Sequence, residues 1–461
     1  MMEQTRVGFV VFGVHKDGLA DPMGAPFIDP AIVDAARGAL RANGLDLVEA
    51  EVVVSTRKEA RACFDRLRRM EDVQAVVLFA GTWVWAAHLV GALRELSLGG
   101  KGIVLWTHPG SQGWRTVGGL VLHGGLEEVG IPHRFLYGEA SDPQTLHSIV
   151  SYCRASHLRN RLRQTTAGLF GGRGMGQTCG QVDPAQWMRT FGVDIDSRDT
   201  SQLVAEAEKL DASTVEEYRA RAQKSFRDPI PRSPTAERSI RLLGAIDRFV
   251  AREGWDFYSI QSFPGIADDY SATCLAQSMM VEWGVPTSTL GDMNTLLSVI
   301  TLMSLSPERV YYGDLQHIDR ERREIKIIGD GACPPSLAGT VGPARFAEHG
   351  IPTEGAAGGL SVDLVCKEGR GVLARAGRAA GELEMVVARC QVREPAKEEV
   401  RRRREECHIP FWPHAFVTVD ADMEQLVQSW KNEYAVLGYG SHLYQQIHDF
   451  CRLTGIRLIA L

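Results

Sequence analysis

Two aspartates at the ends of an apolar segment are the residues whose spacing first suggests chemistry. Asp292 opens the segment and Asp314 closes it. The residues between them predict a buried helix over 296–305 and a short strand over 309–314 that breaks at Gly313. If helix and strand pack antiparallel, both carboxylates face one pocket, which suits a hard divalent cation. The simpler alternative is that Asp292 caps a helix and Asp314 forms a turn.

Length, charge and cysteine content limit the class of protein. A chain of 461 residues is too long for one hydrophobic core, so two or three domains are expected. The net charge of -6 argues against a nucleic-acid partner, and the arginines at 401–404 are flanked by glutamates, which predicts a solvated helix face. Nine scattered cysteines without a CxxC pair favour reduced thiols and a cytoplasmic protein.

The N-terminus and one apolar stretch were weighed as targeting or membrane signals. The first residues run directly into a strand-like pattern, so no secretory signal is expected. Residues 75–93 carry no formal charge over about a transmembrane length. Their pattern is that of a buried strand that leads into a helix, which predicts soluble core and no membrane partner.

Residues 1–163 predict an N-terminal α/β domain. Apolar runs at 7–14, 47–54, 75–81, 102–108 and 133–138 alternate with helical patterns, as in a doubly wound parallel sheet. Ligands of such sheets bind at the carboxyl ends of the strands, where Trp83 and Trp85 fall. Together with Trp412, these rings could stack on a sugar face, and the alternative is that they are ordinary core aromatics.

Residues 164–305 predict a second α/β domain. A strand near 165–170 leads into a glycine-rich turn that contains Arg173 but supplies no GxGxxG register, so NAD is not expected. The turn either provides a tight bend or lets Arg173 contact an anion or a sugar. The charged stretch 193–242 predicts helices, Asp268 and Asp269 predict a helix start, and Gln261, in a strand-like run, is a further substrate-contact candidate.

Residues 306–461 predict a C-terminal β-rich, barrel-like domain. Short strand patterns at 323–329, 360–367, 371–377 and 381–392 are separated by glycine and proline. The segment WPHAFV at 412–417 and the segment NEY at 432–434 place polar residues beside strands. A helix over 443–453 and a final strand are expected to close the chain.

In their order and spacing, several motifs resemble the L-fucose isomerase and L-arabinose isomerase superfamily, particularly its fucose-isomerase-like branch. The motifs are GGRGMGQTCGQVDPAQWMRTFGVDID (171–196), DDYSATCLAQSMM (268–280), GDGACPPSLAG (329–339), GVLARAGR (371–378), WPHAFV and the closing TGIRLIAL. The resemblance covers nearly the whole chain. It implies an aldose–ketose isomerase that uses Mn²⁺, with Mg²⁺ or Co²⁺ as alternatives. It also implies a homo-oligomer, a trimer, tetramer or hexamer, with active sites near subunit contacts.

The resemblance also implies a set of site residues, from which this sequence departs. The family's metal-binding Glu falls at Asp292, with Asn294 where a second acidic residue of that motif stands, and the family's C-terminal His falls at Glu433. Asp314 is unchanged. The implied metal ligands are therefore Asp292, Asp314 and Glu433, with His414 as a substitute ligand or substrate contact. Asp292 and Asp314 are expected to act as base and acid, in an order that is left open.

The function hypothesis is isomerisation of a sugar through an ene-diol. The substrate is a neutral or deoxy sugar, or an acidic sugar, sulfonated or phosphorylated, that is bound through Arg173 and other cations. Two alternatives remain. The first is motivated by the departures at Asp292 and Glu433, and the second by shared chemistry. One is a non-catalytic sugar- or metal-binding protein on the same scaffold. The other is a sugar epimerase, which begins with the same proton abstraction.

Overall fold

The structure is a computed structural model that describes residues 5–14, 28–110, 114–349, 356–406 and 411–461. The chain forms two compact units. Unit 1 comprises residues 1–161 with 448–454, and unit 2 comprises residues 162–447 with 455–461. The predicted division into three domains, with boundaries after residues 163 and 305, stays a prediction.

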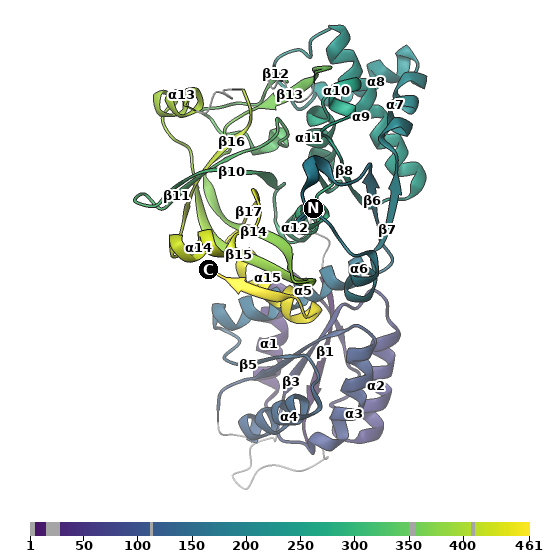
Figure 1. The fold of residues 1–461 in the computed structure, drawn as a ribbon. Coiled ribbons are helices and arrows are strands. Elements are labelled where there is room, and N and C mark those ends of the chain that lie inside the picture. Colours follow the sequence, from purple (N-terminus) through teal and green to yellow (C-terminus); the bar gives the residue numbers. More distant parts are fainter. Residues whose placement is uncertain (1–4, 15–27, 111–113, 350–355, 407–410) are drawn as a thin grey trace. The chain divides into compact units, whose positions relative to one another are not determined.

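Unit 1 is built on a five-stranded parallel sheet in the order β2-β1-β3-β4-β5 (Figure 1). Its strands are β1 (Thr5–Phe12), β2 (Leu45–Glu49), β3 (Ala75–Ala80), β4 (Gly102–Thr107) and β5 (Arg134–Tyr137). Its helices are α1 (Pro30–Ala42), α2 (Arg57–Arg69), α3 (Ala86–Leu98), α4 (Arg115–Val129) and α5 (Pro143–Leu162). Strand and helix alternate along the chain, which confirms the predicted α/β architecture.

Both faces of this sheet are covered. Alternate residues of β3 point to opposite faces, so Val77 packs with Val33 of α1, whereas Val76 packs with Phe64 of α2 and Leu122 of α4. The fully apolar strand β3 is therefore buried on both sides, as expected of a doubly wound sheet. Among the described residues, no helix has the length and apolar character needed to span a membrane.

Unit 2 begins with a four-stranded parallel sheet in the order β7-β6-β8-β9. Its strands are β6 (Thr166–Phe170), β7 (Asp194–Arg198), β8 (Phe257–Ile260) and β9 (Thr287–Ser288). The helices are α6 (Pro184–Phe191), α7 (Thr200–Lys209), α8 (Ala212–Gln223), α9 (Pro234–Glu253), α10 (Ile266–Asp269), α11 (Cys274–Trp283) and α12 (Met293–Leu305). The second α/β segment is confirmed.

Two local predictions in this segment were wrong. The stretch 193–242 is not helical throughout, because Asp194–Arg198 forms the edge strand β7, which pairs with β6. An edge strand of this composition carries no apolar periodicity to reveal it. Asp268 and Asp269 do not begin the long helix. They end the short helix α10, and α11 starts at Cys274.

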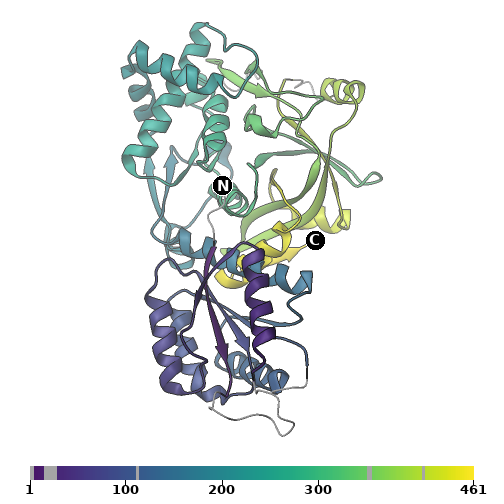
Figure 2. The same ribbon diagram turned by 180° about the vertical axis from the view of Figure 1, so that it is seen from behind.

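The rest of unit 2 contains a closed antiparallel barrel in the order β14-β17-β10-β11-β16-β15, which closes where β15 pairs with β14 (Figure 2). Its strands are β10 (Tyr311–Asp319), β11 (Glu324–Ile328), β14 (Gly369–Ala379), β15 (Glu382–Arg393), β16 (His414–Val419) and β17 (Tyr434–Tyr439). The other elements are β12 (Arg345–Glu348), β13 (Leu360–Asp363), α13 (Lys397–Glu405), α14 (Met423–Ser429) and β18 (Arg457–Ala460). Helix α15 (Leu443–Thr454) begins in unit 2, and its residues 448–454 belong to unit 1. The predicted β-rich, barrel-like segment is confirmed.

The strand that carries Asp314 does not break at Gly313, contrary to the sequence prediction. Strand β10 continues through Gly313 to Asp319. A Cβ atom at Gly313 would lie 2.6 Å from the carbonyl oxygen of Ile328. The glycine therefore permits the close approach of β11 rather than ending the strand.

Candidate functional site

Asp292 lies at the N-terminus of α12, where its carboxylate is fully used by neighbours. Its Oδ1 accepts a hydrogen bond from the Thr295 backbone N–H at 2.8 Å, which caps the helix. Its Oδ2 accepts from Thr295 Oγ1 at 2.9 Å and from Arg375 Nη2 at 2.8 Å. Asp292 is 0% exposed and the Arg375 side chain 3%, so this is a buried ion pair. The simpler alternative for Asp292, a helix cap, is what the structure contains.

The predicted metal-ligand set does not fit a cation in this arrangement. A divalent ion at Asp292 would lie beside the positively charged Arg375 guanidinium and would displace the hydrogen bond from Arg375 Nη2 that neutralises the buried carboxylate. Asp314 is on β10, and no bond joins it to Asp292 in the part of the chain that the structure describes. Spacing along the sequence could not reveal Arg375, which is 83 residues from Asp292.

The glycine-rich turn holds the start of α12 in place. The backbone N–H of Gly174 donates to the Leu290 carbonyl at 2.9 Å, and a Cβ at Gly174 would lie 2.7 Å from that oxygen. Gly291 has a φ of 65°, and a Cβ there would lie 2.0 Å from the Gly172 carbonyl oxygen. Only glycine fits at these contacts. Arg173, in the same turn, has an exposed side chain.

Gln261 and Asn294, both predicted to contact substrate, bind the backbone of this turn. Gln261 Oε1 accepts from the Gly172 N–H at 2.8 Å. Asn294 Nδ2 donates to the carbonyl oxygens of Cys179 and Gln181 at 2.7 and 3.1 Å. The buried Asn294 Oδ1 has no hydrogen-bond partner. Both side chains therefore fix the turn against α12.

Three carboxylates from distant parts of unit 2 gather beside β10. Asp314 pairs directly with Tyr434 across the β10–β17 ladder, so their side chains share a face. The Tyr434 hydroxyl donates to Asp330 Oδ2 at 2.8 Å, and the Leu315 N–H donates to the Glu433 carbonyl at 2.8 Å. We call Asp314, Asp330 and Glu433 the acidic cluster. The structure thus brings together two of the three predicted ligands and adds Asp330.

Burial and the neighbouring carboxylates of the acidic cluster raise the pKa of Asp314. Burial raises the pKa of Asp314 well above its ordinary value, and the charges of Asp330 and Glu433 raise it further. Burial also raises the pKa of Tyr434, with added contributions from Asp330 and Asp314. A carboxyl group whose pKa is raised beside other carboxylates is a candidate for proton transfer.

The glycine-rich turn also contacts the acidic cluster. Gln177 Nε2 donates a hydrogen bond to Glu433 Oε1, and Asn432 Nδ2 donates to Cys179 Sγ at 2.7 Å. The same turn that anchors Asp292 therefore fixes the chain just before β17. The sequence motifs include both the turn and Glu433, but they do not predict the hydrogen bond between Gln177 and Glu433.

Polar and aromatic groups extend the site beyond Asp330. Trp412 among them is a predicted substrate contact, whereas Cys274, His349 and Phe263 have no predicted role. Cys274 Sγ donates to the Asp330 carbonyl at 2.8 Å and lies 3.6 Å from His349 Nδ1. The His349 ring centroid lies 5.6 Å from that of Phe263 and 5.8 Å from that of Trp412. Trp412 is 4% exposed, and its buried Nε1 has no hydrogen-bond partner. Asp330 lies in the segment GDGACPPSLAG, so the sequence did contain a signal for it.

His414 is held inside the protein rather than presented to a ligand. It is fully buried at the start of β16, and its Nδ1–H donates to the Trp412 carbonyl at 2.6 Å. Burial, with a smaller contribution from the charge of Arg404, lowers the pKa of His414 to about 3. His414 on β16 pairs with Ile328 on β11, which in turn pairs with Asp314 on β10. His414 is therefore two strands, about 10 Å, from Asp314. The structure gives it a structural role.

The two N-terminal tryptophans lie in unit 1, after the carboxyl end of β3. Trp83 is half-buried and Trp85 is 63% exposed, and their ring centroids are 5.2 Å apart. An exposed indole at this sheet edge is compatible with ligand stacking. Their role in substrate binding stays a prediction.

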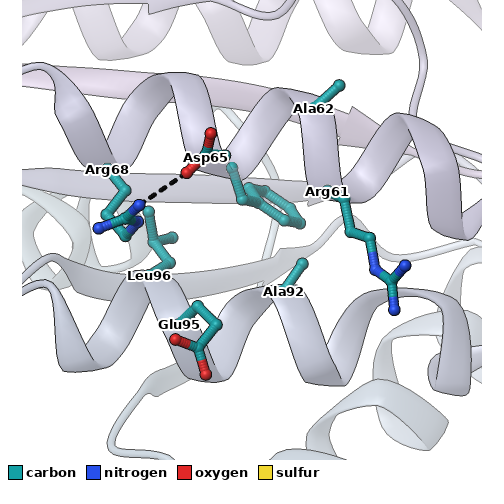
Figure 3. A pocket seen from close by; sticks show the side chains of 8 residues that line it. Arg61, Ala62, Asp65, Arg68, Ala92, Glu95 and Leu96 are labelled. Carbon is teal, nitrogen blue, oxygen red and sulfur yellow. Dashed lines mark hydrogen bonds and ion pairs between the residues drawn. The ribbon is translucent and has the colours of Figure 1, made fainter.

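Two hollows elsewhere lack the chemistry of the acidic cluster. Figure 3 shows a hollow of about 440 Å³ between α2 and α3 of unit 1, where Asp65 accepts a hydrogen bond from Arg68 at 2.7 Å. A hollow of about 630 Å³ in unit 2 is lined by Arg322, Arg323, Arg370 and Arg389, near the β10–β11 hairpin. Asp314 lines neither hollow. We therefore place the candidate site at the acidic cluster.

The fold and the acidic cluster define a class: an α/β protein with a closed barrel and a partly buried group of carboxylates. Comparison with known proteins finds partial similarities. Over 218 residues, which are 47% of this chain and 48% of the relative, the chain is 21% identical to a sulfoquinovose isomerase of Clostridium sp. (strain MSTE9). It is 22% identical over 222 residues to sulfoquinovose isomerases of Priestia aryabhattai and Priestia megaterium, 48% of this chain and 49% of each relative.

These similarities are partial. The matched region spans about half the length of the curated relatives, and no family model matches the chain. Among solved structures, a periplasmic solute-binding protein of an ABC transporter from Actinobacillus succinogenes 130z, with bound D-allose, aligns at 10% identity over 64% of this chain and 88% of that chain. Its TM-score of 0.18 is too low to support any conclusion.

Proposed function

We propose that this protein is an aldose–ketose isomerase that acts on a sulfonated sugar. The observation that carries the proposal is Asp314, a carboxyl group whose pKa is raised by burial and by two neighbouring carboxylates. The similarity to sulfoquinovose isomerases supports both the reaction and the substrate class. A sulfonated hexose is also the acidic kind of substrate that the sequence analysis considered.

The acidic cluster can carry out both proton transfers of an ene-diol reaction. Protonated Asp314 donates its proton to the carbonyl oxygen O1 while an ionised carboxylate of the cluster removes the proton from C2. In the second half, the carboxylate that took the C2 proton, which can exchange it with water, protonates C1, and Asp314 recovers a proton from the O2 hydroxyl. C2 and O2 have then each lost a proton, C1 and O1 have each gained one, and the cluster returns to its starting state. Since the carboxylates titrate together, we assign the base to the cluster rather than to one residue.

The expected Mn²⁺, or Mg²⁺ or Co²⁺ in its place, is not used in these steps. The buried Asp292–Arg375 ion pair removes one of the three predicted ligands. Among the described residues, Asp314, Asp330 and Glu433 do not form a group with one ligand atom each within 4.8 Å of the others. The carboxylates alone therefore account for the proton transfers, and metal dependence is left to experiment.

Turnover tests the proposal directly. Purified full-length protein is incubated with sulfoquinovose and with a panel of neutral aldoses, and ketose formation is followed by NMR. Parallel samples contain either EDTA or added Mn²⁺. We expect ketose from the sulfonated sugar and at least a hundredfold loss in Asp314→Asn, because positioned acid–base groups contribute about 10²–10⁴-fold.

Asp319→Asn is the matched control, since Asp319 lies on the same strand outside the acidic cluster. It should keep wild-type turnover. Full activity in Asp314→Asn would refute the assignment of the site. Activity confined to neutral aldoses would refute the substrate class while leaving the reaction intact.

A non-catalytic sugar-binding protein is the second candidate, because one specific observation favours it. Asp292 falls at the position of a metal ligand in the isomerases that this sequence resembles, and here Arg375 neutralises its charge. This candidate predicts that sulfoquinovose raises the thermal midpoint without any turnover, with or without Mn²⁺. Any turnover that depends on Asp314 excludes it.

A further inference from the structure

A second set of ligand-type side chains lies in unit 1 and shares no residue with the acidic cluster. His123 and Glu127 are four residues apart on α4, so they share one face of the helix. The helix ends at Gly130, which adopts a left-handed conformation with a φ of 71°, and the chain turns back to place His133 just before β5. His123, Glu127 and His133 each offer one ligand atom within 4.8 Å of the others.

The hydrogen bonds define the state of the two imidazoles. His133 is 1% exposed, and its Nδ1 lies 2.8 Å from the Ile131 carbonyl oxygen, so Nδ1 must carry the proton of a neutral ring. The Nε2 atom of His133 is then a lone-pair acceptor. It lies 2.8 Å from His123 Nδ1, which therefore donates the hydrogen bond between the rings. A backbone carbonyl that fixes one nitrogen and frees the other is the arrangement typical of metal-binding histidines.

The carboxylate completes the set. Glu127 Oε1 lies 3.8 Å from His133 Nε2 and 4.0 Å from His123 Nδ1. His123 stacks on Phe135 with ring centroids 4.5 Å apart and an interplanar angle of 7°, which holds the imidazole in place. The His123 and Glu127 side chains are 32% and 56% exposed, so water can reach the fourth side of the set.

We propose that His123, Glu127 and His133 bind one divalent transition-metal ion such as Zn²⁺. Two imidazoles and one carboxylate, with room for water, match the borderline-soft ions rather than Mg²⁺ or Ca²⁺. The ion would fasten the end of α4 to the segment that enters β5. This proposal is independent of the isomerase assignment, which rests on unit 2.

Binding requires two adjustments that the structure allows. The proton on His123 Nδ1 must leave, and since this ring is about one third exposed, the proton can move through water to Nε2 without a net change in charge. The two ligand nitrogens, now 2.8 Å apart, must separate to roughly 3.3 Å to coordinate a tetrahedral Zn²⁺ at about 2.0–2.1 Å.

Arg452 is the cation that faces this set. Its Nη2 lies 4.0 Å from Glu127 Oε1, and it also contributes to the low pKa of His133. Arg452 therefore competes weakly with the ion for the carboxylate. Replacing it by Met should strengthen metal binding, which distinguishes a metal site from a salt-bridge network.

The test is Zn²⁺ binding to the full-length protein after removal of metal with a chelator. Isothermal titration with Zn²⁺ should give one site, and Co²⁺ should give visible absorption bands of a low-coordinate nitrogen–oxygen site. His123→Phe keeps the stacking on Phe135 but removes the ligand nitrogen, and Glu127→Gln removes the anion. Each should weaken Zn²⁺ at least about tenfold, the loss seen even when outer-shell partners are removed.

Two controls make the outcome decisive. Glu128→Gln changes the neighbouring exposed glutamate on α4 and should leave the affinity within about twofold. Asp314→Asn removes the carboxylate on which the proposed function rests and should also leave Zn²⁺ binding unchanged. Absence of a Zn²⁺ site in the wild-type protein, equal affinity in His123→Phe and wild type, or loss of the site in Asp314→Asn would each overturn the proposal.

Discussion

The buried ion pair between Asp292 and Arg375 makes a quantitative prediction about stability. Arg375→Met keeps the apolar length of the side chain but leaves the Asp292 carboxylate buried without its cation. Both side chains are at most 3% exposed, so the magnitude of a broken buried pair applies, about 3–5 kcal/mol. With a shift of at least about 2 °C per kcal/mol for a unit of this size, the thermal midpoint of unit 2 should fall by about 6 °C or more.

A double-mutant cycle separates the pair from its surroundings. Asp292→Asn retains an acceptor for the Thr295 N–H, so its cap is largely kept while the charge is lost. The double variant Asp292→Asn/Arg375→Met removes both charges, and it should therefore be more stable than the Arg375→Met single variant. Differential scanning calorimetry on the full-length protein gives the midpoints.

Arg378→Met is the matched control on the same strand, since within the described ranges Arg378 donates hydrogen bonds only to the Gly381 carbonyl near the β14–β15 turn. It should shift the midpoint by less than about 2 °C. An Arg375→Met variant as stable as this control would refute the interpretation of Asp292 as a structural partner. A gain in the stability of Arg375→Met on addition of Mn²⁺ would show instead that Asp292 can serve as a metal ligand once the guanidinium is removed.

Three further predictions concern titration and backbone conformation. The raised pKa of Asp314 makes the folded chain hold a proton that the unfolded chain releases above about pH 4, so this group lowers stability as the pH rises above that value. In urea unfolding, Asp314→Asn should therefore gain stability relative to wild type as the pH rises above about 4. Asp319→Asn removes a carboxyl whose pKa is lowered, so it should instead lose stability over the same pH range. The pKa of His414 is about 3 in the folded chain, so this residue costs stability as the pH falls from about 6.5 towards 3. His414→Gln should therefore reduce the loss of stability in acid. An unchanged dependence of stability on pH would contradict the burial argument. Gly291→Ala should destabilise the protein or prevent its folding, because its Cβ would lie 2.0 Å from the Gly172 carbonyl oxygen. Gly176 also has a positive φ but open space around it, so Gly176→Ala should cost only about 1–2 kcal/mol. Similar thermal midpoints for the two variants would contradict the close approach of Gly291 to Gly172.

The architecture could be predicted from the sequence where apolar periodicity was strong. The strand patterns of unit 1 and the buried helix α12 follow from runs such as AVVLFA and from the apolar segment after Asp292. The edge strand β7, with the sequence DIDSR, carries no such pattern, and its charged surroundings predict helix instead. Gly313 was read as a strand end because its role, the close approach of β11, depends on a partner strand.

The candidate site could be predicted only in part, for the same reason. Motif order placed Asp314 and Glu433 together, and the structure agrees that both lie beside β10. Spacing could not show that Asp292 is paired with Arg375, since that contact joins α12 to a barrel strand. His123 and His133 were overlooked because their pairing depends on the turn at Gly130, although the spacing of His123 and Glu127 on one helix face was a usable signal.

Solvent-proton transfer measures the central claim most directly, because the acidic cluster is proposed to carry the proton between C2 and C1. Wild-type protein and Asp314→Asn are incubated with sulfoquinovose in D₂O, and deuterium in the ketose product is measured by NMR and mass spectrometry. The account predicts that the wild-type product carries deuterium at C1, and that the Asp314→Asn sample shows neither product nor exchange at C2. Equal exchange at C2 in both proteins would contradict the assignment of proton transfer to the acidic cluster.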